Sequence, residues 1–498
     1  MATHSFLLNN AELDFYTSGR STVSFLGPQA YKAETHITLI AGANGTSKSR
    51  LLASLVEQLC EIEARRVAVD SSRRFPSTGG HGLLCSELSA FVNGQLSEFS
   101  TKPNSDSSEL SQPFGLPSRI LVLSNLVMDK FHFPSGITAE TQFYHYLGVR
   151  QATNLTTTGS LERAVTEAVL SIASDQQRLQ SFQAWIELVF SGERELAFQF
   201  PRFRLAELEK YLNTNNRAEL IRERMQRRMG SRRSIDIEST LIEQTVRDVT
   251  ELFEFLNGKI TDYQSTPKQG RNQPDPLMRL VKLAKADKER LGQLAPLLSS
   301  ASRAGYSAWP SLCIEANPWL QFNQLSSGEQ NILSVGAKLI ANARAGCLIA
   351  IDEPEVSLNV AWQQHYTDLI RKSLVLAPGS HVLIATHSPH LIASLTTRNA
   401  SILMIEKNQK SLSFKTVDAQ FEGWGSESVL YQVLRIPSAS SYLFHRELAN
   451  VLEHLQNNGT DKNLIDGFLQ TAKKIDFAGI DPLEEVIAEI QAYAEALN

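Results

Sequence analysis

The chain has 498 residues, of which 42% are hydrophobic, so it can bury a substantial core and global disorder is not expected. Its 48 Lys and Arg against 53 Asp and Glu give a net charge of −5, which argues against a nucleic-acid binder that uses its whole surface. The four cysteines form no Cys-x-x-Cys pair or metal-ligand spacing, which favours a reducing compartment. The N-terminus does not resemble a signal peptide, and no apolar run reaches the roughly 18 residues of a membrane span. We therefore expect a cytoplasmic protein without a membrane partner.

The predicted elements begin with an antiparallel layer, because residues 1–35 alternate weakly between apolar and polar side chains. Short apolar runs that end in polar or Gly-rich sequence predict buried strands. Helical patterns follow three of these runs, which indicates a largely parallel sheet covered by helices. The four predicted strands are residues 36–41, 119–124, 347–352 and 381–386.

The segments between these strands are more polar. Residues 71–118 are rich in Ser, Gly and Pro and predict surface loops around one helix near 85–99. Residues 155–310 are charged and helix-like, with a short coiled-coil-like pattern of apolar residues between 235 and 260. Residues 400–417 predict a β-hairpin, and the tail beyond 426 predicts helices with a polar break near Asn457–Lys462.

These elements predict an α/β protein: a mostly parallel sheet with helices, an antiparallel N-terminal layer, a helical insertion and a helical tail. We expect the N-terminal half of the head in 1–150 and the insertion in 151–315. The second half of the head should follow in 316–425, and a helical partner or oligomer region in 426–498.

The first motif is GANGTSKS, which follows the first predicted parallel strand and precedes a helical pattern. Backbone N–H groups at the start of a helix bind phosphates, Lys48 would reach the β- and γ-phosphates, and Ser49 would bind Mg²⁺. Ser47 replaces the usual last glycine, and its Cβ would crowd the loop, which would either slow hydrolysis or rearrange the loop slightly. The alternative is a Gly-rich turn with an incidental lysine. The expected nucleotide-binding residues here are Gly42, Ala43, Asn44, Gly45, Thr46, Ser47, Lys48 and Ser49.

The second motif is LSSGEQ, from Leu325 to Gln330, which begins another helical pattern. A Ser/Gly start of this kind caps a helix and directs N–H groups and a hydroxyl at an anion. A purely structural cap is the alternative. The candidate nucleotide-binding residues are Ser326, Ser327, Gly328 and Glu329.

Two further motifs follow buried strands. Asp352 and Glu353 end the run LIAIDE, where Asp352 would hold Mg²⁺ and Glu353 would act as general base toward a water molecule. His387 follows the strand HVLIAT and should reach the same edge of the sheet, where it would sense the γ-phosphate. The alternatives are two solvated acids and a structural histidine. We expect ATP and Mg²⁺ as ligands, and Glu353, His387 and Lys48 as the catalytic residues.

In this order, the four motifs resemble those of the soluble ATP-binding-cassette (ABC) ATPases of the RecF, SMC and overcoming-lysogenization-defect (OLD) group. The resemblance implies a head-to-tail dimer with two ATPs at the interface, in which the LSSGEQ segment meets the γ-phosphate bound by the opposite subunit. It also implies a D-loop at Ser357, Leu358 and Asn359. Many relatives have His-Pro after Ser-Leu, whereas this chain has Asn359-Val360.

Residues 118–134 and 143–161 are similar to segments of anti-phage ATPase subunits, especially those of the Septu (PtuA) and retron-associated kinds. Ser124 and Asn125 occupy the place of the Q-loop in such proteins, so its glutamine is absent here. The resemblance implies an oligomeric ATPase that gates a separate nuclease of the HNH type. A TOPRIM nuclease, as in PARIS systems, is the alternative partner. No Asp-x-Asp follows His387 at a strand end, so we expect ATP hydrolysis alone in this chain.

An arginine-rich stretch in the insertion is a candidate nucleic-acid contact. The alternative is a solvated or subunit-bridging helix end. The arginines are Arg222, Arg224, Arg227, Arg228, Arg232 and Arg233. Three hypotheses therefore stay open: a defence ATPase that gates a nuclease, a DNA-repair ATPase of the RecF/SMC type, and a nucleotide-bound scaffold with little hydrolysis.

Overall fold

The computed structural model divides the chain into two compact units. The first contains Met1–Tyr146, Ala345–Asp368 and Pro378–Asn498, and the second contains Leu147–Arg344 and Leu369–Ala377. The residues that the structure describes are 4–15, 19–28, 34–43, 45–67, 83–100, 115–126, 129–131, 143–148, 158–200, 210–211, 213–229, 239–258, 279–283, 286–306, 309–356, 358–395, 399–408, 411–418, 426–433, 441–457, 461–473, 475 and 481–496.

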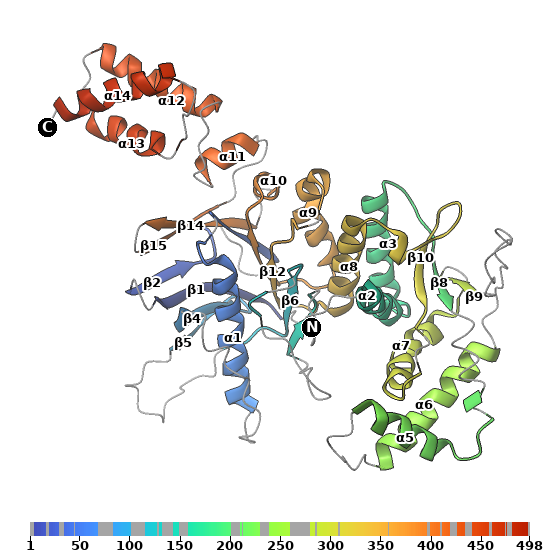
Figure 1. The fold of residues 1–498 in the computed structure, drawn as a ribbon. Helices are drawn as coiled ribbons and strands as arrows, with labels where there is room; N and C mark the ends of the chain where they lie inside the picture. Colours follow the sequence, from blue (N-terminus) through green and yellow to red (C-terminus); the bar gives the residue numbers. More distant parts are fainter. Residues whose placement is uncertain are drawn as a thin grey trace. The chain divides into compact units, whose positions relative to one another are not determined.

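A seven-stranded sheet forms the centre of the first unit, in the order β15-β14-β3-β13-β12-β6-β7 (Figure 1). All four predicted strands belong to it and pair in parallel. Their apolar runs are buried on both faces, as a parallel sheet covered by other layers requires. The strands are β3 (His36–Gly42), β6 (Ile120–Ser124), β7 (Tyr144–Tyr146), β12 (Leu348–Asp352), β13 (His381–Thr386), β14 (Ala400–Asn408) and β15 (Ser411–Asp418). The hairpin predicted at 400–417 is confirmed by the antiparallel pairing of β14 with β15.

An antiparallel sheet, β2-β1-β4-β5, forms a second layer of this unit and confirms the predicted N-terminal layer. Its strands are β1 (Phe6–Phe15), β2 (Gly19–Ser24), β4 (Leu83–Val92) and β5 (Gln95–Ser100). The helix expected near 85–99 is wrong, because β4 and β5 form a hairpin there. Asn93 and Gly94 connect the two strands with φ of 51° and 79°. An Asn-Gly pair with two positive φ angles is the type I′ turn that two-residue hairpins favour.

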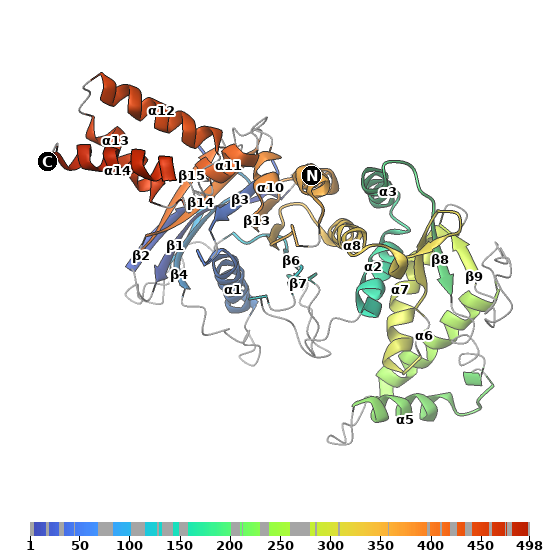
Figure 2. The same ribbon diagram turned by 45° about the horizontal axis from the view of Figure 1, so that its top comes forward.

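Helix α1 (Lys48–Val67) packs against both sheets (Figures 1 and 2). Its apolar side chains share one buried cluster with residues of β1, β3, β4, β6, β12, β13 and β14. A short connection joins Gly42, the last residue of β3, to Lys48, the first residue of α1. The packing of α1 therefore fixes where this connection begins and ends. Helices α9 (Val360–Ser373) and α10 (Pro389–Ala393) follow β12 and β13.

The second unit combines helices with a small antiparallel sheet, β11-β10-β8-β9. Its helices are α2 (Thr158–Ile172), α3 (Gln176–Phe190), α5 (Arg217–Met229), α6 (Ser239–Gly258), α7 (Lys288–Arg303) and α8 (Ser327–Asn342). Its strands are β8 (Leu196–Phe200), β9 (Arg279–Lys282), β10 (Ser311–Ile314) and β11 (Leu320–Gln321), followed by the 3₁₀ turn η1 (Phe322–Gln324). The sequence predicted only helices here, because strands of two to five residues are too short to show a clear alternation.

The helical tail is confirmed and has a core of its own. Its elements are α11 (Ser426–Gln432), α12 (Tyr442–Gln456), α13 (Lys462–Ala472) and α14 (Asp481–Ala496). The predicted polar break coincides with the end of α12 and the start of α13, where Asp461 caps α13. Among the described helices, none is both long and apolar enough to cross a membrane.

Candidate functional site

The connection from β3 to α1 contains the residues of the predicted phosphate-binding loop. A Cβ on Gly42 would lie 2.6 Å from the Ile405 carbonyl oxygen and 2.8 Å from Thr46 Oγ1, so only glycine fits. Gly45 and Ser47 have φ of 78° and 67°, in the left-handed region. Ser47 therefore carries the backbone strain that the usual glycine would avoid, whereas Asn44 lies outside the described residues.

Lys48 is the first residue of α1, and its ammonium group is held inside the loop. Nζ donates to the carbonyl oxygens of Gly42 at 2.8 Å and Ala43 at 3.2 Å, and it lies 3.2 Å from His387 Nδ1. Burial lowers the pKa of Lys48 to about 8, while Glu353 and two neighbouring acids oppose this shift. Since this pKa remains above 7, the side chain is mostly charged at neutral pH and can bind phosphate.

Asp352 ends β12 and is fully buried. Its Oδ1 accepts a hydrogen bond from Ser49 Oγ at 2.9 Å, so the two predicted Mg²⁺ ligands lie side by side. Its Oδ2 is buried without a partner among the described residues. Burial raises the pKa of Asp352 to about 7, the Ser49 hydrogen bond opposes this, and nearby carboxylates add to it.

A divalent cation fits this pair of oxygen donors, since it would satisfy Oδ2 and stabilise the charged carboxylate. No group of three His, Cys, Asp or Glu side chains arranged for a metal occurs in the described part of the chain. Mg²⁺ does not need one, because it is commonly held by one or two protein oxygens, water and substrate phosphates. The residues present therefore fit Mg²⁺ bound together with a nucleotide.

Glu353 and His387 complete the cluster. Glu353 has φ of 46°, an unfavourable conformation for a non-glycine residue, and its N–H donates to the Ala385 carbonyl oxygen at 2.9 Å. Its Oε1 lies 3.6 Å from His387 Nε2. Burial, aided by the charge of Lys48, lowers the pKa of His387 to about 4, so the imidazole is neutral at pH 7 and this contact is not an ion pair.

The LSSGEQ segment belongs to the second unit, where it caps α8. Ser326 Oγ accepts from Glu329 N at 3.3 Å, and Glu329 Oε2 accepts from Ser326 N at 2.8 Å. This reciprocal capping box is the structural role that the sequence offered as the alternative. Ser326 and Ser327 are exposed and Gly328 is buried, so the start of α8 can also present hydroxyl groups to a ligand.

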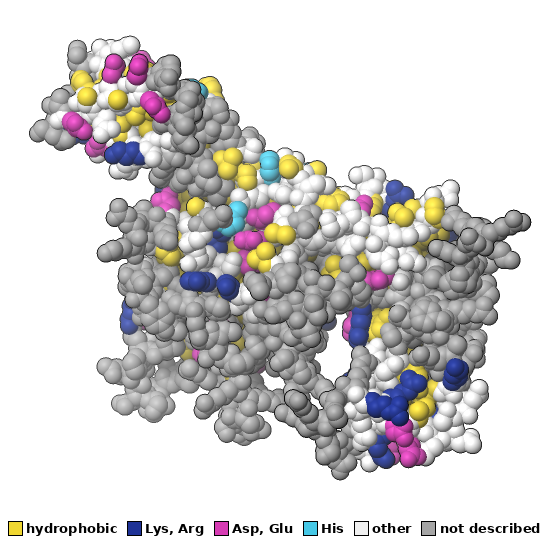
Figure 3. Space-filling model, in the orientation of Figure 1, with side chains coloured by type: hydrophobic (Ala, Val, Ile, Leu, Met, Phe, Trp, Pro, Cys, Tyr) yellow, Lys and Arg dark blue, Asp and Glu magenta, His cyan; other side chains and the backbone are white. Residues whose placement is uncertain are grey.

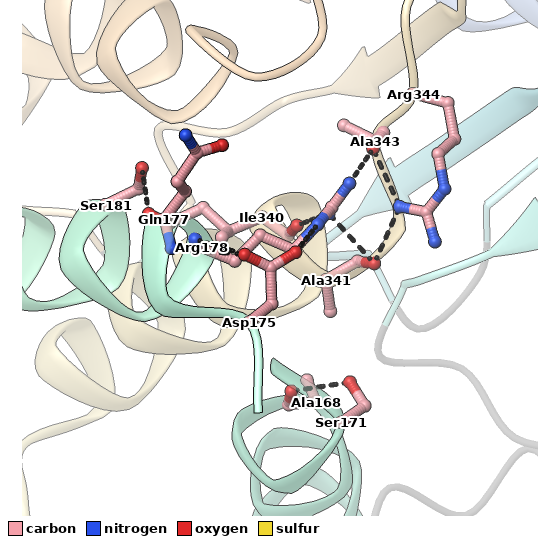
Figure 4. Close-up of polar contacts among 10 residues, drawn as sticks. All are labelled: Ala168, Ser171, Asp175, Gln177, Arg178, Ser181, Ile340, Ala341, Ala343 and Arg344. Atoms are coloured by element: carbon pink, nitrogen blue, oxygen red, sulfur yellow. Dashed lines mark hydrogen bonds and ion pairs between the residues drawn. The ribbon is translucent and has the colours of Figure 1, made fainter. Parts of the chain in front are cut away.

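The other end of α8 is fixed by two arginines (Figure 4). Arg178, which pairs with Asp175, donates to the carbonyl oxygens of Ile340, Ala341 and Ala343. Arg344 donates to the last two of these oxygens at 3.2 and 2.9 Å. Cations at a helix C-terminus satisfy its free carbonyl groups and its dipole. Helix α8, which begins within the LSSGEQ segment, is therefore held at both ends.

Sequence reasoning missed two acids near Asp352. Glu355 accepts hydrogen bonds from the loop after β13, and Asp129 accepts from Phe131 N at 3.0 Å and from the Tyr146 hydroxyl. Both carboxylates lie close enough to raise the pKa of Asp352. In the sequence, what pointed to a role for Glu355 was its place two residues after Glu353, in the segment that follows the strand of Asp352. Of the expected D-loop, Ser357 lies outside the described residues, Leu358 is buried and Asn359 is exposed.

The arginines of α5 are only partly available to a ligand. Arg222 and Arg227 are exposed, but Arg227 pairs with Glu223 at 3.2 Å, and the Arg224 guanidinium stacks on the Tyr306 ring at 4.3 Å. Figure 3 shows basic and acidic side chains side by side in the part of the surface that carries this helix. The side chain of Arg228 and the whole of Arg232 and Arg233 lie outside the described residues.

Comparison with known families gives one match, over residues 185–393, to the family described as "AAA domain, putative AbiEii toxin, Type IV TA system". The matched residues include the LSSGEQ segment, Asp352, Glu353 and His387, but not the predicted phosphate loop. Among curated proteins, none matches the sequence significantly.

Solved structures that are similar to this chain include two SMC head domains and one ATP-binding cassette. The SMC head domain from Thermotoga maritima has 11% identity and a TM-score of 0.32, over 83% of this chain and 99% of its own. An SMC head bound to the C-terminal domain of ScpA, derived from Pyrococcus furiosus, has 11% identity and a TM-score of 0.29, over 83% and 96%. The ADP conformation of MJ1267, an ATP-binding cassette of an ABC transporter, has 12% identity and a TM-score of 0.30, over 86% and 95%.

Scores this low support no inference about activity or partners. The family match covers three of the four clustered residues, Asp352, Glu353 and His387, but not Lys48. Over residues 185–393 the chain is thus similar to a family of AAA domains, and a mostly parallel sheet lies at the centre of its first unit.

Proposed function

We propose that this chain is an ABC-type ATPase that binds ATP with Mg²⁺ and hydrolyses it to ADP and phosphate. One observation carries the proposal: residues from three distant stretches of sequence meet at the carboxyl edge of one parallel sheet, where ligands bind in open α/β sheets. These residues are Lys48, Ser49, Asp352, Glu353 and His387.

Each side chain has a chemical role that follows from its surroundings. Lys48 and the loop N–H groups would bind phosphate oxygens, and Ser49 with Asp352 would hold Mg²⁺, which neutralises phosphate charge when it is bound. Glu353 is the acceptor for a proton from the attacking water. His387 Nδ1 lies 3.2 Å from Lys48 Nζ, and a neutral imidazole with its proton on Nε2 would accept from Lys48 and donate to a phosphate oxygen or to that water.

Three variants test hydrolysis. Lys48→Ala should abolish nucleotide binding, and Glu353→Gln should retain binding while turnover is lost. Glu98→Ala, on the exposed part of β5, should leave both unchanged. Normal ATP affinity of Lys48→Ala would show that the phosphate loop is misplaced. Turnover that survives in Glu353→Gln would remove Glu353 from the role of general base.

We also propose that ATP joins two copies of the chain, with Ser326 and Gly328 of one copy closing over Lys48 and Glu353 of the other. The exposed, capped start of α8 supports this assignment. Native mass of the Glu353→Gln variant with ATP should show a dimer or a larger assembly. The same variant carrying Lys48→Ala should not respond to ATP, and an ATP-independent mass would refute nucleotide-driven assembly.

For the biological role we propose a Septu-like ATPase subunit of an anti-phage complex, in which ATP occupancy restrains a separate nuclease of the HNH or TOPRIM type. The sequence resemblance in 118–134 and 143–161 supports it, and the matched family description names a toxin of a toxin–antitoxin system. Co-expression with the adjacent open reading frame, followed by native mass, is the test. A stable complex with a small nuclease chain is expected, and an unbound neighbour would refute it.

Two other roles each have an observation in their favour. Exposed Arg222 and Arg227 favour a repair ATPase, which predicts DNA-stimulated turnover that weakens when both are changed to Ala. The strained Ser47 favours a nucleotide-bound scaffold, which predicts no measurable turnover in the parent protein.

A further inference from the structure

One carboxylate joins the turn after β12 to the loop after β13. Glu355 Oε1 accepts hydrogen bonds from Thr386 Oγ1 at 2.9 Å and from His387 N at 2.6 Å. Thr386 Oγ1 in turn accepts from Ser388 N at 2.9 Å. Three successive residues at the end of β13 are therefore fixed by hydrogen bonds that converge on Glu355.

Within the part of the chain that the structure describes, the second oxygen of the Glu355 carboxylate contributes no hydrogen bond that would stabilise the fold. Oε2 is buried and has no hydrogen-bond partner among the residues described. Burial raises the pKa of Glu355, and the hydrogen bond from the His387 backbone is the largest effect that opposes the shift. A buried carboxylate with one unpaired oxygen costs free energy, so Glu355 is a poor choice if it serves only to stabilise the fold. What its hydrogen bonds do achieve is to fix the position of the loop after β13.

The loop carries the imidazole of the candidate catalytic cluster. His387 Nδ1 lies 3.2 Å from Lys48 Nζ, and His387 Nε2 lies 3.6 Å from Glu353 Oε1. Both distances depend on where the backbone of His387 lies, and Glu355 binds the N–H group of that backbone. Glu355 also acts on Lys48 through its charge, which helps to keep the ammonium protonated.

We propose that Glu355 is a positioning residue for ATP hydrolysis, which holds the backbone of His387 so that its imidazole stays between Lys48 and Glu353. The inference rests on the proposed ATPase function. Glu355 acts on the reaction through His387 rather than through contact with the phosphates. Loss of its carboxylate should therefore lower turnover and leave nucleotide binding, which depends on Lys48 and the loop, nearly intact.

The first test compares Glu355→Ala with Glu355→Gln. Alanine removes the acceptor, whereas glutamine keeps an oxygen that can accept from both Thr386 and His387. We expect Glu355→Ala to lower kcat by about tenfold or more, because small misplacements of a catalytic group are costly. The Kd for a non-hydrolysable ATP analogue should change less than about threefold, and Glu355→Gln should restore most of kcat. Glu98→Ala is the matched control.

A double-mutant cycle separates positioning from a general loss of structure. If Glu355 acts through His387, adding Glu355→Ala to His387→Ala should lower kcat by less than about twofold more. An equal fold-loss from Glu355→Ala in both backgrounds would overturn the proposal. Thr386→Val, which removes one of the two donors to Glu355, provides a milder variant and should give a smaller loss of kcat.

Different results would refute the proposed ATPase function and the role of Glu355. Turnover that is absent in the parent protein, or insensitive to Glu353→Gln, would refute the proposed function. Turnover that Glu353→Gln abolishes and Glu355→Ala leaves unchanged would refute only the role of Glu355.

Discussion

Two buried histidines lie at the start of β3 and of β13, at the opposite ends of these strands from the candidate site. They make the first unit sensitive to acid. His381 begins β13 and is fully buried, with its ring 5.4 Å from that of His36. Its Nδ1 accepts from Leu8 N at 3.0 Å. Thr38 Oγ1 gives its proton to the Phe25 carbonyl oxygen, so it accepts from His381 Nε2 at 2.9 Å. Only the neutral Nε2–H tautomer satisfies both contacts.

Burial and the neighbouring His36 lower the pKa of His381 well below its ordinary value of 6.5. Below that value the unfolded state binds a proton that the folded state does not, so stability is lost as the pH falls. Each pH unit below 6.5 costs about 1.4 kcal/mol, and this one group contributes a loss of about 1.4 kcal/mol between pH 7.5 and 5.5.

The matched variant is His381→Asn, whose side-chain oxygen can accept from Leu8 N but which does not titrate. His387 also has a lowered pKa, but it is present in both proteins and cancels in the comparison. Amide hydrogen exchange of peptides from β1 and β13, corrected for the intrinsic rate at each pH, gives the opening free energies. The parent protein should lose about 1.4 kcal/mol more than the variant between the two pH values. Equal losses would refute the assigned tautomer and its role.

Three further perturbations test local packing and strain. A Cβ on Gly336 would lie 2.4 Å from the Trp185 ring, so Gly336→Ala should destabilise the second unit by about 1–3 kcal/mol in thermal unfolding. The control is Gly467→Ala in α13, where a Cβ meets open space and the melting temperature should not fall. Equal melting temperatures of the two variants would refute the contact between Gly336 and Trp185. Ser47→Gly relieves a φ of 67° and should stabilise the loop by about 1 kcal/mol, so a lower melting temperature would contradict the assigned strain. Burial raises the pKa of Cys60 to about 12, so mass spectrometry should find its thiol unalkylated at pH 8 until the chain is denatured; rapid native labelling would show that the thiol is accessible.

The sequence was most informative where local pattern and chemistry coincide. The parallel strands β3, β6, β12 and β13 are short apolar runs, and each places a polar loop at the same edge of the sheet. That edge could therefore be predicted to collect Lys48, Asp352 and His387. The error at 85–99 came from neglecting turn chemistry, since Asn93-Gly94 between two alternating stretches is a hairpin signal.

Other features depend on tertiary contacts that no local pattern contains. Thr38, His381 and Ser401 come from three different strands, and only their pairing in the sheet creates the buried polar network. In the sequence, nothing distinguishes Glu355 from the other acidic residues at the end of β12. Its role follows from the position of the His387 backbone, which belongs to the neighbouring strand connection.

The charges around Lys48 indicate how the cluster differs from a simple anion site. Three carboxylates, those of Asp352, Glu353 and Glu355, lie close enough to influence this single ammonium group. Such a cluster repels phosphate unless a cation compensates for it, and the bare Oδ2 of Asp352 is available to bind one. The three acids, to which we assign Mg²⁺, the attacking water and the position of His387, would therefore make nucleotide binding depend on its metal. The proposed hydrolysis and metal-dependent binding would thus follow from one arrangement of residues at the end of β12.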